Sequence, residues 1–256
     1  MPADMPLAGT HAVVTGASRG IGAAIALRLA QLGAQLTLMG RDRAALEREA
    51  ARSPQGTAIV CDVTDPAQVE LAFSEARGRA AVAILINNAG ATESAPFLKT
   101  TDAALERLLD VNVTSAFRCT RAVLPSMIEA GWGRIVNIAS IAGLRGYPYV
   151  TAYCAAKHAV VGLTRALAME SAKSGVTVNA VCPGYTDTAL VRNAAAAIAE
   201  KTGRSEAQSV AQLIRGNPQA RLIRPEEIAD TVAWLCGRGA GSITGQAIAV
   251  AGGEIM

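Results

Sequence analysis

Short apolar runs alternate with helix-forming segments along almost the whole chain, and this alternation strongly limits the possible folds. Seven runs have the length of a buried strand, at residues 11–15, 34–39, 57–61, 83–86, 134–138, 176–181 and 247–250. A strand that is followed by a helix and then by another strand is typical of a parallel sheet with right-handed crossovers. The pattern predicts an α/β fold, a single doubly wound domain that spans residues 1–256.

The intervals between these runs carry the predicted helices. They cover residues 21–32, 42–52, 65–77, 101–130, 153–173 and 225–235. Asp42 is a good N-cap for the second of these helices, and Pro66 suits the first turn of the third. Residues 185–224 break the alternation, because they contain helical pieces at 194–199 and 206–215 but no strand. Their apolar residues at helical spacing would allow them to form an apolar lid.

Composition excludes several classes of protein. Aromatic residues make up only 4 % of the 256 residues, so the core must be built from Ala, Val, Leu and Ile, which suits parallel strands covered by helices. The net charge is +3 and no run of Lys and Arg is present, so a nucleic-acid partner is not supported. With two histidines in the chain, a His-rich metal site is excluded, and we expect no metal.

Cysteine usage and the N-terminus bear on the compartment. The five cysteines are scattered singly, which argues against a disulfide framework and favours buried thiols in a reducing compartment. The N-terminus has neither a basic region nor an apolar stretch typical of a signal peptide. No apolar run approaches the ~20 residues that a membrane-spanning helix needs. We therefore expect a cytoplasmic protein with no membrane partner.

A glycine-rich segment follows the first predicted strand and opens the first predicted helix. It reads Thr15-Gly16-Ala17-Ser18-Arg19-Gly20-Ile21-Gly22. Glycines let a backbone turn sharply and approach a pyrophosphate, and a helix N-terminus favours its negative charge. The spacing is G-x-x-x-G-x-G rather than G-x-G-x-x-G, and a plain turn would use the same glycines. The position between strand and helix favours dinucleotide binding.

A second pattern combines a hydroxyl, a phenol and an amine. Ser140 follows the fifth predicted strand, and Tyr153 and Lys157 begin the next helix. Residues at i and i+4 share a helix face, so the ammonium of Lys157 is expected beside the phenol of Tyr153. A neighbouring positive charge lowers the pKa of a phenol, which would suit it to acid–base chemistry. The Tyr-x-x-x-Lys pattern alone is weak, because chance supplies many examples.

Taken together, these motifs resemble the short-chain dehydrogenase/reductase family, in its common ~250-residue form. The matching residues follow in order along the chain: Thr15–Gly22, Asp62-Val63, Asn87–Gly90, Asn112, Ser140, Tyr153-x-x-x-Lys157, Pro183-Gly184 and Ile243–Gln246. The resemblance implies a Rossmann-type domain with a seven-stranded parallel sheet. It also implies an NAD(P)(H)-dependent oxidoreductase that interconverts a secondary alcohol and a ketone.

The resemblance assigns roles to four catalytic residues. Tyr153 would exchange a proton with the substrate oxygen, and Ser140 would hydrogen-bond that oxygen. Lys157 would bind the ribose hydroxyls of the cofactor and lower the pKa of Tyr153. Asn112 would hold a water next to the lysine as part of a proton relay. A helix-capping or backbone-competing role is the alternative for this asparagine.

The resemblance also implies the cofactor contacts. Besides the glycine-rich segment, these are Arg41 near the 2′-position of the ribose, Asp62 and Val63 near the adenine, Asn88 and Gly90 near adenine and ribose, Pro183, Gly184 and Thr188 near the nicotinamide, and Tyr153 and Lys157 themselves. A turn stabilised by local backbone bonds is an alternative role for Asn87 and Asn88.

The choice between NADP(H) and NAD(H) depends on the end of the second strand. An acidic residue that would bind the ribose 2′-OH is expected there, but the position is Gly40, followed by Arg41. Arg19 and Arg41 can pair with a 2′-phosphate instead, a pair that resembles the NADP-preferring pattern of the family. Asp42 is the counter-argument, although its position as a helix cap accounts for it. NADP(H) is therefore expected over NAD(H).

The substrate is less well determined. Residues 217–228 resemble family members that act on 3-hydroxyacyl thioesters or 3-hydroxybutyrate, and an alicyclic, aromatic or steroid alcohol is an alternative. Arg192, Arg215 and Arg221 would meet an acidic substrate or lie on solvated helix faces. Tyr147 and Tyr149 would line the pocket or simply pack.

Two further expectations concern function and assembly. A catalytically silent NAD(P)-binding regulator is the alternative from another class, and the presence of all four catalytic residues argues against it. The family resemblance also suggests a homotetramer, or a homodimer.

Overall fold

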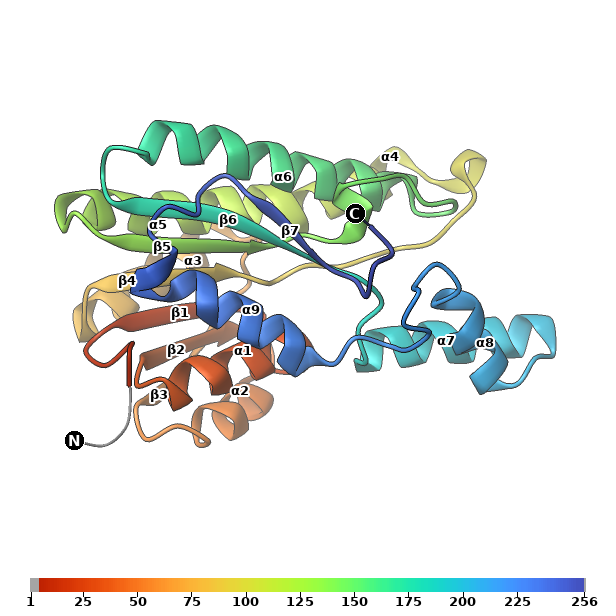
Figure 1. The fold of residues 1–256 in the computed structure, drawn as a ribbon, viewed down its shortest axis with the longest axis horizontal. Coiled ribbons are helices and arrows are strands. Elements are labelled where there is room, and N and C mark those ends of the chain that lie inside the picture. Colours follow the sequence, from red (N-terminus) through yellow and green to blue (C-terminus); the bar gives the residue numbers. More distant parts are fainter. Residues whose placement is uncertain (1–4, 256) are drawn as a thin grey trace.

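The computed structural model describes residues 5–255, and within them seven parallel strands form one sheet, in the order β3-β2-β1-β4-β5-β6-β7 (Figure 1). The strands are β1 (His11–Thr15), β2 (Gln35–Gly40), β3 (Gly56–Val60), β4 (Val82–Asn87), β5 (Gly133–Ile138), β6 (Val176–Pro183) and β7 (Ala247–Val250). Strand order reverses beside β1, so the carboxyl ends of β1 and β4 flank the switch point where such sheets bind ligands. The predicted fold class is confirmed.

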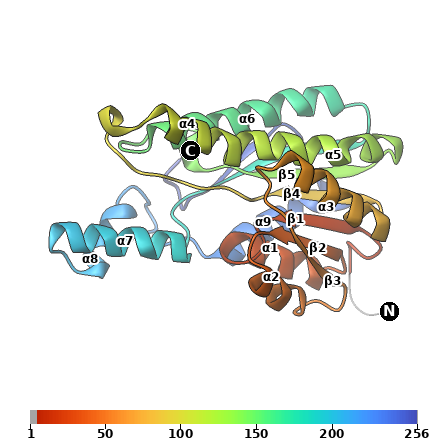
Figure 2. The same ribbon diagram turned by 180° about the vertical axis from the view of Figure 1, so that it is seen from behind.

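Side chains alternate across the sheet, and each face has its own helical layer. In β1, Ala12 and Val14 pack into one core cluster, whereas Val13 packs into the other. The first cluster includes residues of α1 (Gly20–Gln31), α2 (Arg43–Ala50) and α9 (Pro225–Cys236). The second includes residues of α3 (Pro66–Arg79), α5 (Ser115–Glu129) and α6 (Thr151–Ser171). Figure 2 shows the second layer from behind.

Helix starts follow the signals in the sequence. The carboxylate of Asp42 accepts a hydrogen bond from Ala45 N at 3.0 Å, as expected for the cap of α2. Asp65 caps α3 in the same way, with Pro66 in the first turn.

The predicted helix over residues 101–130 is not one regular helix. It consists of α4 (Asp102–Leu109), a π-helical turn (Asp110–Thr114) and α5. In a π-helical turn the backbone hydrogen bonds span five residues instead of four, which widens the helix locally. Such turns are frequent at functional sites. Asn112 lies inside this turn, which explains how an asparagine is accommodated in the middle of a helical segment.

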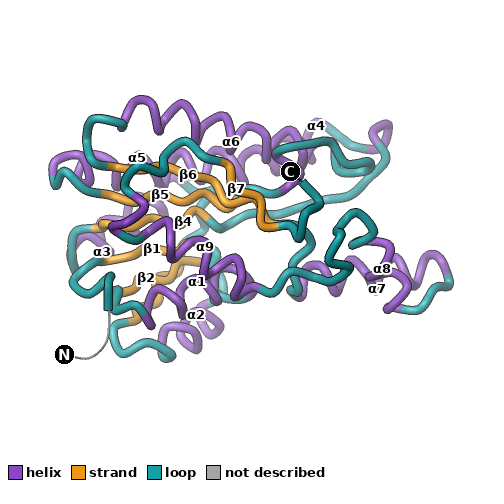
Figure 3. The backbone as a smooth tube through the Cα atoms, viewed as in Figure 1, coloured by secondary structure: helices purple, strands orange, loops and turns teal. Residues whose placement is uncertain are grey.

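Two helices project from the carboxyl edge of the sheet, α7 (Ala189–Thr202) and α8 (Glu206–Leu213). α7 begins five residues earlier than the sequence predicts. The pair packs together and stands away from the main body, at the right in Figures 1 and 3. Its base is held by two backbone hydrogen bonds, Asp187 N to Ile223 O and Ile223 N to Tyr185 O, at 2.8 and 2.9 Å. No helix within residues 5–255 is long and apolar enough to cross a membrane.

Candidate active site

The glycine-rich loop connects the carboxyl end of β1 to the start of α1. Gly16 and Gly20 have φ angles of +64° and +58°, a region that disfavours side chains. Arg19 stands at the N-cap position, and among the described residues no side chain caps α1 and no acid lies in its first turn. The first backbone N–H groups of the helix are thus available to an anion. This arrangement fits the pyrophosphate of a dinucleotide.

Asn88 fastens the end of β4 to this loop. Its Nδ2 donates to the carbonyl oxygens of Thr15 and Gly16, each at 3.0 Å. The N–H groups of Asn88 and Ala89 both donate to Thr15 Oγ1 at 3.0 Å. A Cβ at Gly22 would overlap both Asn88 Nδ2 and Gly16 O, so only glycine fits. Sequence reasoning missed this bracing role of Asn88 and assigned no role to Thr15, although Thr15 stands directly before the glycines in the motif.

The residues predicted for the adenine end lie after β2 and β3. Asp62 accepts hydrogen bonds from Thr64 N and Oγ1 at 3.0 and 2.7 Å, and the backbone bond is the main reason its pKa is lowered. Arg41 lies 3.9 Å from this carboxylate, and its side chain remains 80 % exposed. Arg19 is also exposed, whereas Val63 is buried. Both arginines are accessible to a phosphate.

The segment predicted for the nicotinamide side lies next to the glycine-rich loop. Pro183 ends β6, and Gly184 N donates to Val250 O of β7 at 3.0 Å. The methyl group of Thr188 would be 3.3 Å from a Cβ at Gly20, so Thr188 lies over the loop. Residues far apart in the sequence therefore border one edge of the sheet.

Tyr153 and Lys157 lie on α6 and face the end of β5. Lys157 Nζ lies 5.7 Å from the centroid of the Tyr153 ring and donates to Ile138 O at 2.9 Å. A Cβ at Gly143 would be only 2.6 Å from Lys157 O, so the short turn after Ser140 packs directly against α6. Ser140 Oγ accepts from Ala142 N at 3.1 Å, which starts this turn. The structure thus brings Ser140, Tyr153 and Lys157 together.

The pKa of Tyr153 differs from the sequence expectation. Burial raises the pKa of Tyr153 to about 12, and a hydrogen bond with the Ser140 side chain only partly opposes this. Lys157 does not reverse the shift, because burial lowers the pKa of its own ammonium to about 8. In this structure the pKa of the phenol is thus raised, whereas the sequence predicts that Lys157 lowers it. Near neutrality the phenol keeps its proton, as a proton donor requires.

Asn112 reaches the same centre from the π-helical turn. Its Nδ2 donates to Ala91 O and Leu108 O, both at 2.9 Å, whereas its Oδ1 is buried without a partner in the described structure. A Cβ at Gly90 would lie 2.6 Å from Oδ1 and 3.5 Å from Lys157 Nζ, so the amide oxygen and the ammonium approach the same glycine. An unpartnered buried acceptor is costly and indicates a site for a water or a ligand group.

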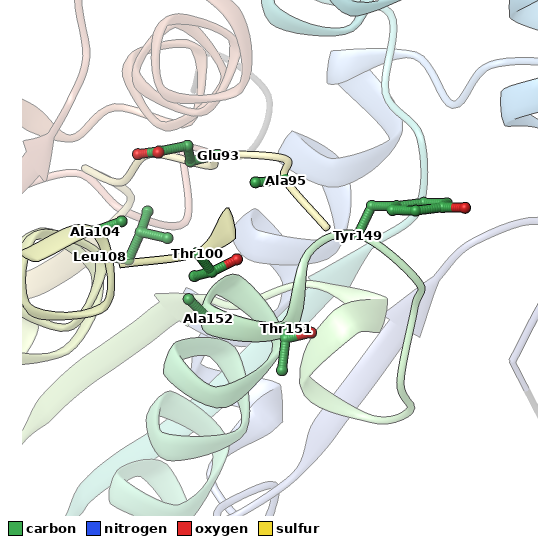
Figure 4. A pocket seen from close by; sticks show the side chains of 8 residues that line it. All are labelled: Glu93, Ala95, Thr100, Ala104, Leu108, Tyr149, Thr151 and Ala152. Atoms are coloured by element: carbon green, nitrogen blue, oxygen red, sulfur yellow. The ribbon is translucent and has the colours of Figure 1, made fainter. Parts of the chain in front are cut away.

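The loop before α6 precedes Tyr153 and Lys157 and carries two further tyrosines, Tyr147 and Tyr149. Tyr149 has a φ of +66°, a strained value for a tyrosine, and its carbonyl accepts from Ala95 N at 2.8 Å. Behind it lies a cavity of about 10 Å³, room for no more than one water, bordered by Leu108 and Ala152 (Figure 4). The Tyr149 ring points away from these residues and is 62 % exposed. Tyr147 differs, because its hydroxyl donates to Glu254 Oε1 at 2.7 Å.

Two arginines in the segment 185–224, the lid that the sequence predicts, already have carboxylate partners. Arg192 makes two hydrogen bonds to Asp187, at 2.7 and 2.9 Å. Arg221 makes two to Glu227, both at 2.7 Å. Bidentate pairs of this kind satisfy most of a guanidinium's charge, so neither arginine is poised for an acidic substrate.

The fold and the site together define a class of protein. A doubly wound parallel sheet with a glycine-rich loop after its first strand, and with an accessible helix N-terminus beyond it, is the architecture of dinucleotide-binding α/β enzymes.

Comparisons with known proteins narrow this class. A family model described as short chain dehydrogenase matches residues 10–199. D-beta-hydroxybutyrate dehydrogenase of Rhizobium meliloti is 37 % identical over 94 % of this chain and 97 % of that protein. The granaticin polyketide synthase putative ketoacyl reductase 1 of Streptomyces violaceoruber is 38 % identical over 94 % and 92 %. A variant of actinorhodin polyketide ketoreductase, solved with NADPH, superimposes with a TM-score of 0.91 at 34 % identity, over 96 % and 97 %.

The chain therefore belongs to the short-chain dehydrogenase family. It is an oxidoreductase that acts on a CH–OH group, and membership supports a nicotinamide cofactor.

Proposed function

We propose that this protein is an NADP(H)-dependent oxidoreductase that interconverts a secondary alcohol and a ketone, with Tyr153 as its acid and base. The observation that carries the proposal is the convergence of Ser140, Tyr153, Lys157 and Asn112 at the carboxyl edge of the sheet, beside the glycine-rich loop. Family membership supports the reaction class.

The residues that would hold the cofactor extend along this edge. The N-terminus of α1 and the loop Gly16–Gly22 would bind the pyrophosphate, and Asp62, Val63, Asn88 and Gly90 would border the adenosine. Pro183, Gly184 and Thr188 would border the nicotinamide. When bound, the cofactor supplies or accepts the hydride, which this chain's own side chains cannot do.

Tyr153 handles the proton in this proposal. In reduction its phenol gives a proton to the carbonyl oxygen, while Ser140 hydrogen-bonds the same oxygen and orients it. A pKa of about 12 keeps the phenol protonated near neutrality and suits this direction. Lys157, held by Ile138 O, is within reach of the proton path, and Asn112 Oδ1 would hold the water that refills it.

Arg19 and Arg41 support a preference for NADP(H) over NAD(H). Both are exposed, and no carboxylate replaces Gly40 at the end of β2. The carboxylate of Asp42, the acid that follows Arg41 in the sequence, accepts a hydrogen bond from Ala45 N as the N-cap of α2. The test compares kcat/KM for NADPH with that for NADH, and an equal or higher value for NADH would refute the preference.

For the substrate we propose a 3-oxoacyl or 3-hydroxyacyl thioester or a related hydroxy acid. The names of the two relatives above support this class. An alicyclic or aromatic ketone is the second candidate, because Leu98, Phe97 and Leu190 are large apolar residues exposed in the segments that precede α4 and begin α7. In either case residues 185–224 would act as the lid.

One panel experiment separates these candidates. Purified protein is mixed with NADPH and a set of ketones, from 3-oxoacyl thioesters to cyclic and aromatic ketones, and absorbance at the nicotinamide band is followed. Turnover of thioesters supports the first candidate, and turnover of cyclic ketones alone supports the second. Cofactor binding without any turnover would favour a silent regulatory protein and contradict the proposal.

We further propose a homotetramer, or a homodimer, in the cytoplasm. Phe117 on α5 and Met169 on α6 are 49 % and 80 % exposed, as expected of faces that pack against other copies. All five cysteines are buried and free, which fits a reducing compartment. Light scattering in solution tests the assembly, and a monomer would contradict it.

A further inference from the structure

The four residues after β7 contact three parts of the proposed substrate side. These are Gly184, residues 216–218 and the loop before α6. We call residues 251–254 the terminal segment. It begins beside Gly184, where a Cβ would lie 3.1 Å from Ala251 Cα. It therefore starts from the loop proposed for the nicotinamide and continues toward the lid.

The terminal segment next packs against the base of the lid, residues 216–218. Gly252 and Gly253 have φ angles of +63° and +90°, which allow a sharp turn. A Cβ at Gly252 would overlap the Asn217 side chain, and one at Gly253 would lie 3.3 Å from Pro218. Asn217 is 7 % exposed and is itself held by Arg221 O at 2.8 Å. The two stretches therefore pack in close contact, with no room for a side chain at Gly252.

Glu254 then crosses to the loop before α6. Its side chain is 3 % exposed, and its Oε1 accepts from Tyr147 Oη at 2.7 Å and from Arg145 Nη2 at 3.3 Å. The guanidinium of Arg145 lies 4.6 Å from the centroid of the Tyr147 ring, so the two loop residues also hold each other. The same oxygen would be 2.9 Å from a Cβ at Gly216. One buried carboxylate thus contacts the loop and the lid base at once.

Burial of a carboxylate is unfavourable unless hydrogen bonds compensate it. Here the compensating donors both come from the loop, 109 and 107 residues earlier in the chain. Burial, and then the hydrogen bond to Glu254, raises the pKa of Tyr147, so the phenol stays a donor at any ordinary pH. Tyr147 is followed closely by the strained Tyr149 and by Tyr153. A displacement of Glu254 would therefore also displace the loop that carries Tyr147 and Tyr149, next to the proposed substrate site.

We propose that Glu254 is a positioning residue that clasps the substrate loop, residues 145–150, to the base of the lid, residues 216–218. Through this clasp it sets the affinity for the carbonyl substrate without taking part in the chemical step. The proposal rests on the proposed function, because it assigns the clasp to the substrate side of that site.

The test compares Glu254→Ala and Glu254→Gln with a matched control. Asp230→Asn removes the charge of another ion pair, Arg28 to Asp230 at 2.7 Å, between α1 and α9 and away from the substrate loop. For Glu254→Ala we expect KM for the ketone to rise about tenfold, because Tyr147 and Arg145 lose their shared acceptor and the loop loses its tie to residues 216–218. The kcat and the NADPH dissociation constant should stay within about twofold. Glu254→Gln keeps an acceptor for Tyr147 and should raise KM less.

Amide hydrogen exchange provides a readout that needs no turnover. In Glu254→Ala, residues 145–150 and 216–218 should exchange faster than in the wild type, and in Asp230→Asn they should not. Tyr147→Phe removes only the phenol donor and should loosen the same two stretches, which covers the case in which the Ala variant fails to fold. Unchanged exchange at 145–150 would overturn the clasp, as would a lower Tm with KM unchanged. A wild type without any ketone turnover would instead refute the proposed function and leave the exchange result to decide on the clasp.

Discussion

The two proposed halves of the candidate site, one for the cofactor and one for the substrate, are built by different kinds of contact. In the cofactor half, backbone meets backbone or a short amide: Gly16, Gly22 and Asn88 approach so closely that a single Cβ would not fit. In the substrate half, long side chains from distant segments meet, as Tyr147 and Glu254 do.

This difference in contacts explains how proteins of one fold can bind the same cofactor and yet act on different substrates. A backbone cradle tolerates almost no substitution, whereas a wall of side chains can be rebuilt by changing a few residues. We therefore expect substitutions in the first half to affect binding of every nicotinamide cofactor. Substitutions in the second half should alter substrate affinity and local mobility.

The largest effect is expected from Gly22→Ala. The added methyl group would overlap Gly16 O and Asn88 Nδ2, neither of which can move without breaking the hydrogen bond between them. We expect affinity for NADPH to fall by more than about 100-fold, with a loss of about 2 kcal/mol in the free energy of unfolding. Fluorescence titration with NADPH and urea unfolding measure the two effects.

Gly78→Ala is the control for this variant. Gly78 lies in α3 and a Cβ there meets nothing within 4 Å, so the protein should bind NADPH normally and gain about 1 kcal/mol from helix propensity. Normal NADPH affinity in Gly22→Ala would remove the distinction between the two halves.

Lys157→Met tests the junction between the halves. Burial lowers the pKa of Lys157 from 10.5 to about 8, which corresponds to about 3 kcal/mol of instability at neutral pH. The hydrogen bond from Lys157 Nζ to Ile138 O stabilises the wild type by about 1 kcal/mol, and the variant loses this contribution. The variant should therefore be inactive but more stable than the wild type by about 2 kcal/mol at pH 7, as measured by calorimetry.

The pH dependence supplies the control. Below about pH 8 the folded protein carries the buried charge, so the difference between variant and wild type is greatest there. From about pH 8 to 10.5 the folded state loses this proton before the unfolded state does, the wild type gains stability, and the difference should shrink. If the stability difference between Lys157→Met and the wild type were the same at every pH, the buried ammonium would not be the cause of the wild type's lower stability.

The smallest effect is expected from Tyr149→Gly in the substrate loop. Tyr149 is exposed and has a φ of +66°, a conformation that costs a non-glycine residue about 1 kcal/mol. Glycine relieves the strain but adds freedom to the unfolded chain, so we expect a net gain of about 0.5 kcal/mol in the free energy of unfolding. Tyr149→Ala keeps the strain and should show no gain. A stabilised glycine variant with a higher KM would mean that the strain serves substrate binding.

Sequence patterns predict the fold well, and the motifs expected to bind the cofactor lie at one edge of the sheet. Alternating strands and helices give the sheet, and the caps Asp42 and Asp65 give helix starts, because these signals are local. The glycine-rich loop and the Tyr153–Lys157 spacing likewise act over a few residues. The π-helical turn around Asn112 was not predicted, because it depends on how α4 and α5 pack rather than on composition.

The substrate half escapes such reasoning for a physical reason. Nothing near Glu254 in the sequence indicates a buried carboxylate, since its donors lie more than 100 residues away. The raised pKa of Tyr153 was also missed, because burial of the phenol and of Lys157 depends on the packed structure rather than on their spacing.

Tyr153→Phe tests the central claim most directly, because it removes one oxygen and leaves the ring in place. With the best ketone of the panel, we predict that kcat for NADPH-dependent reduction falls about 1,000-fold, the range expected for loss of a general acid. The protein should still bind NADPH, with a dissociation constant within about threefold of the wild type, because Tyr153 is only one of many expected cofactor contacts. A kcat within about threefold of the wild type would contradict the assignment of the proton to Tyr153.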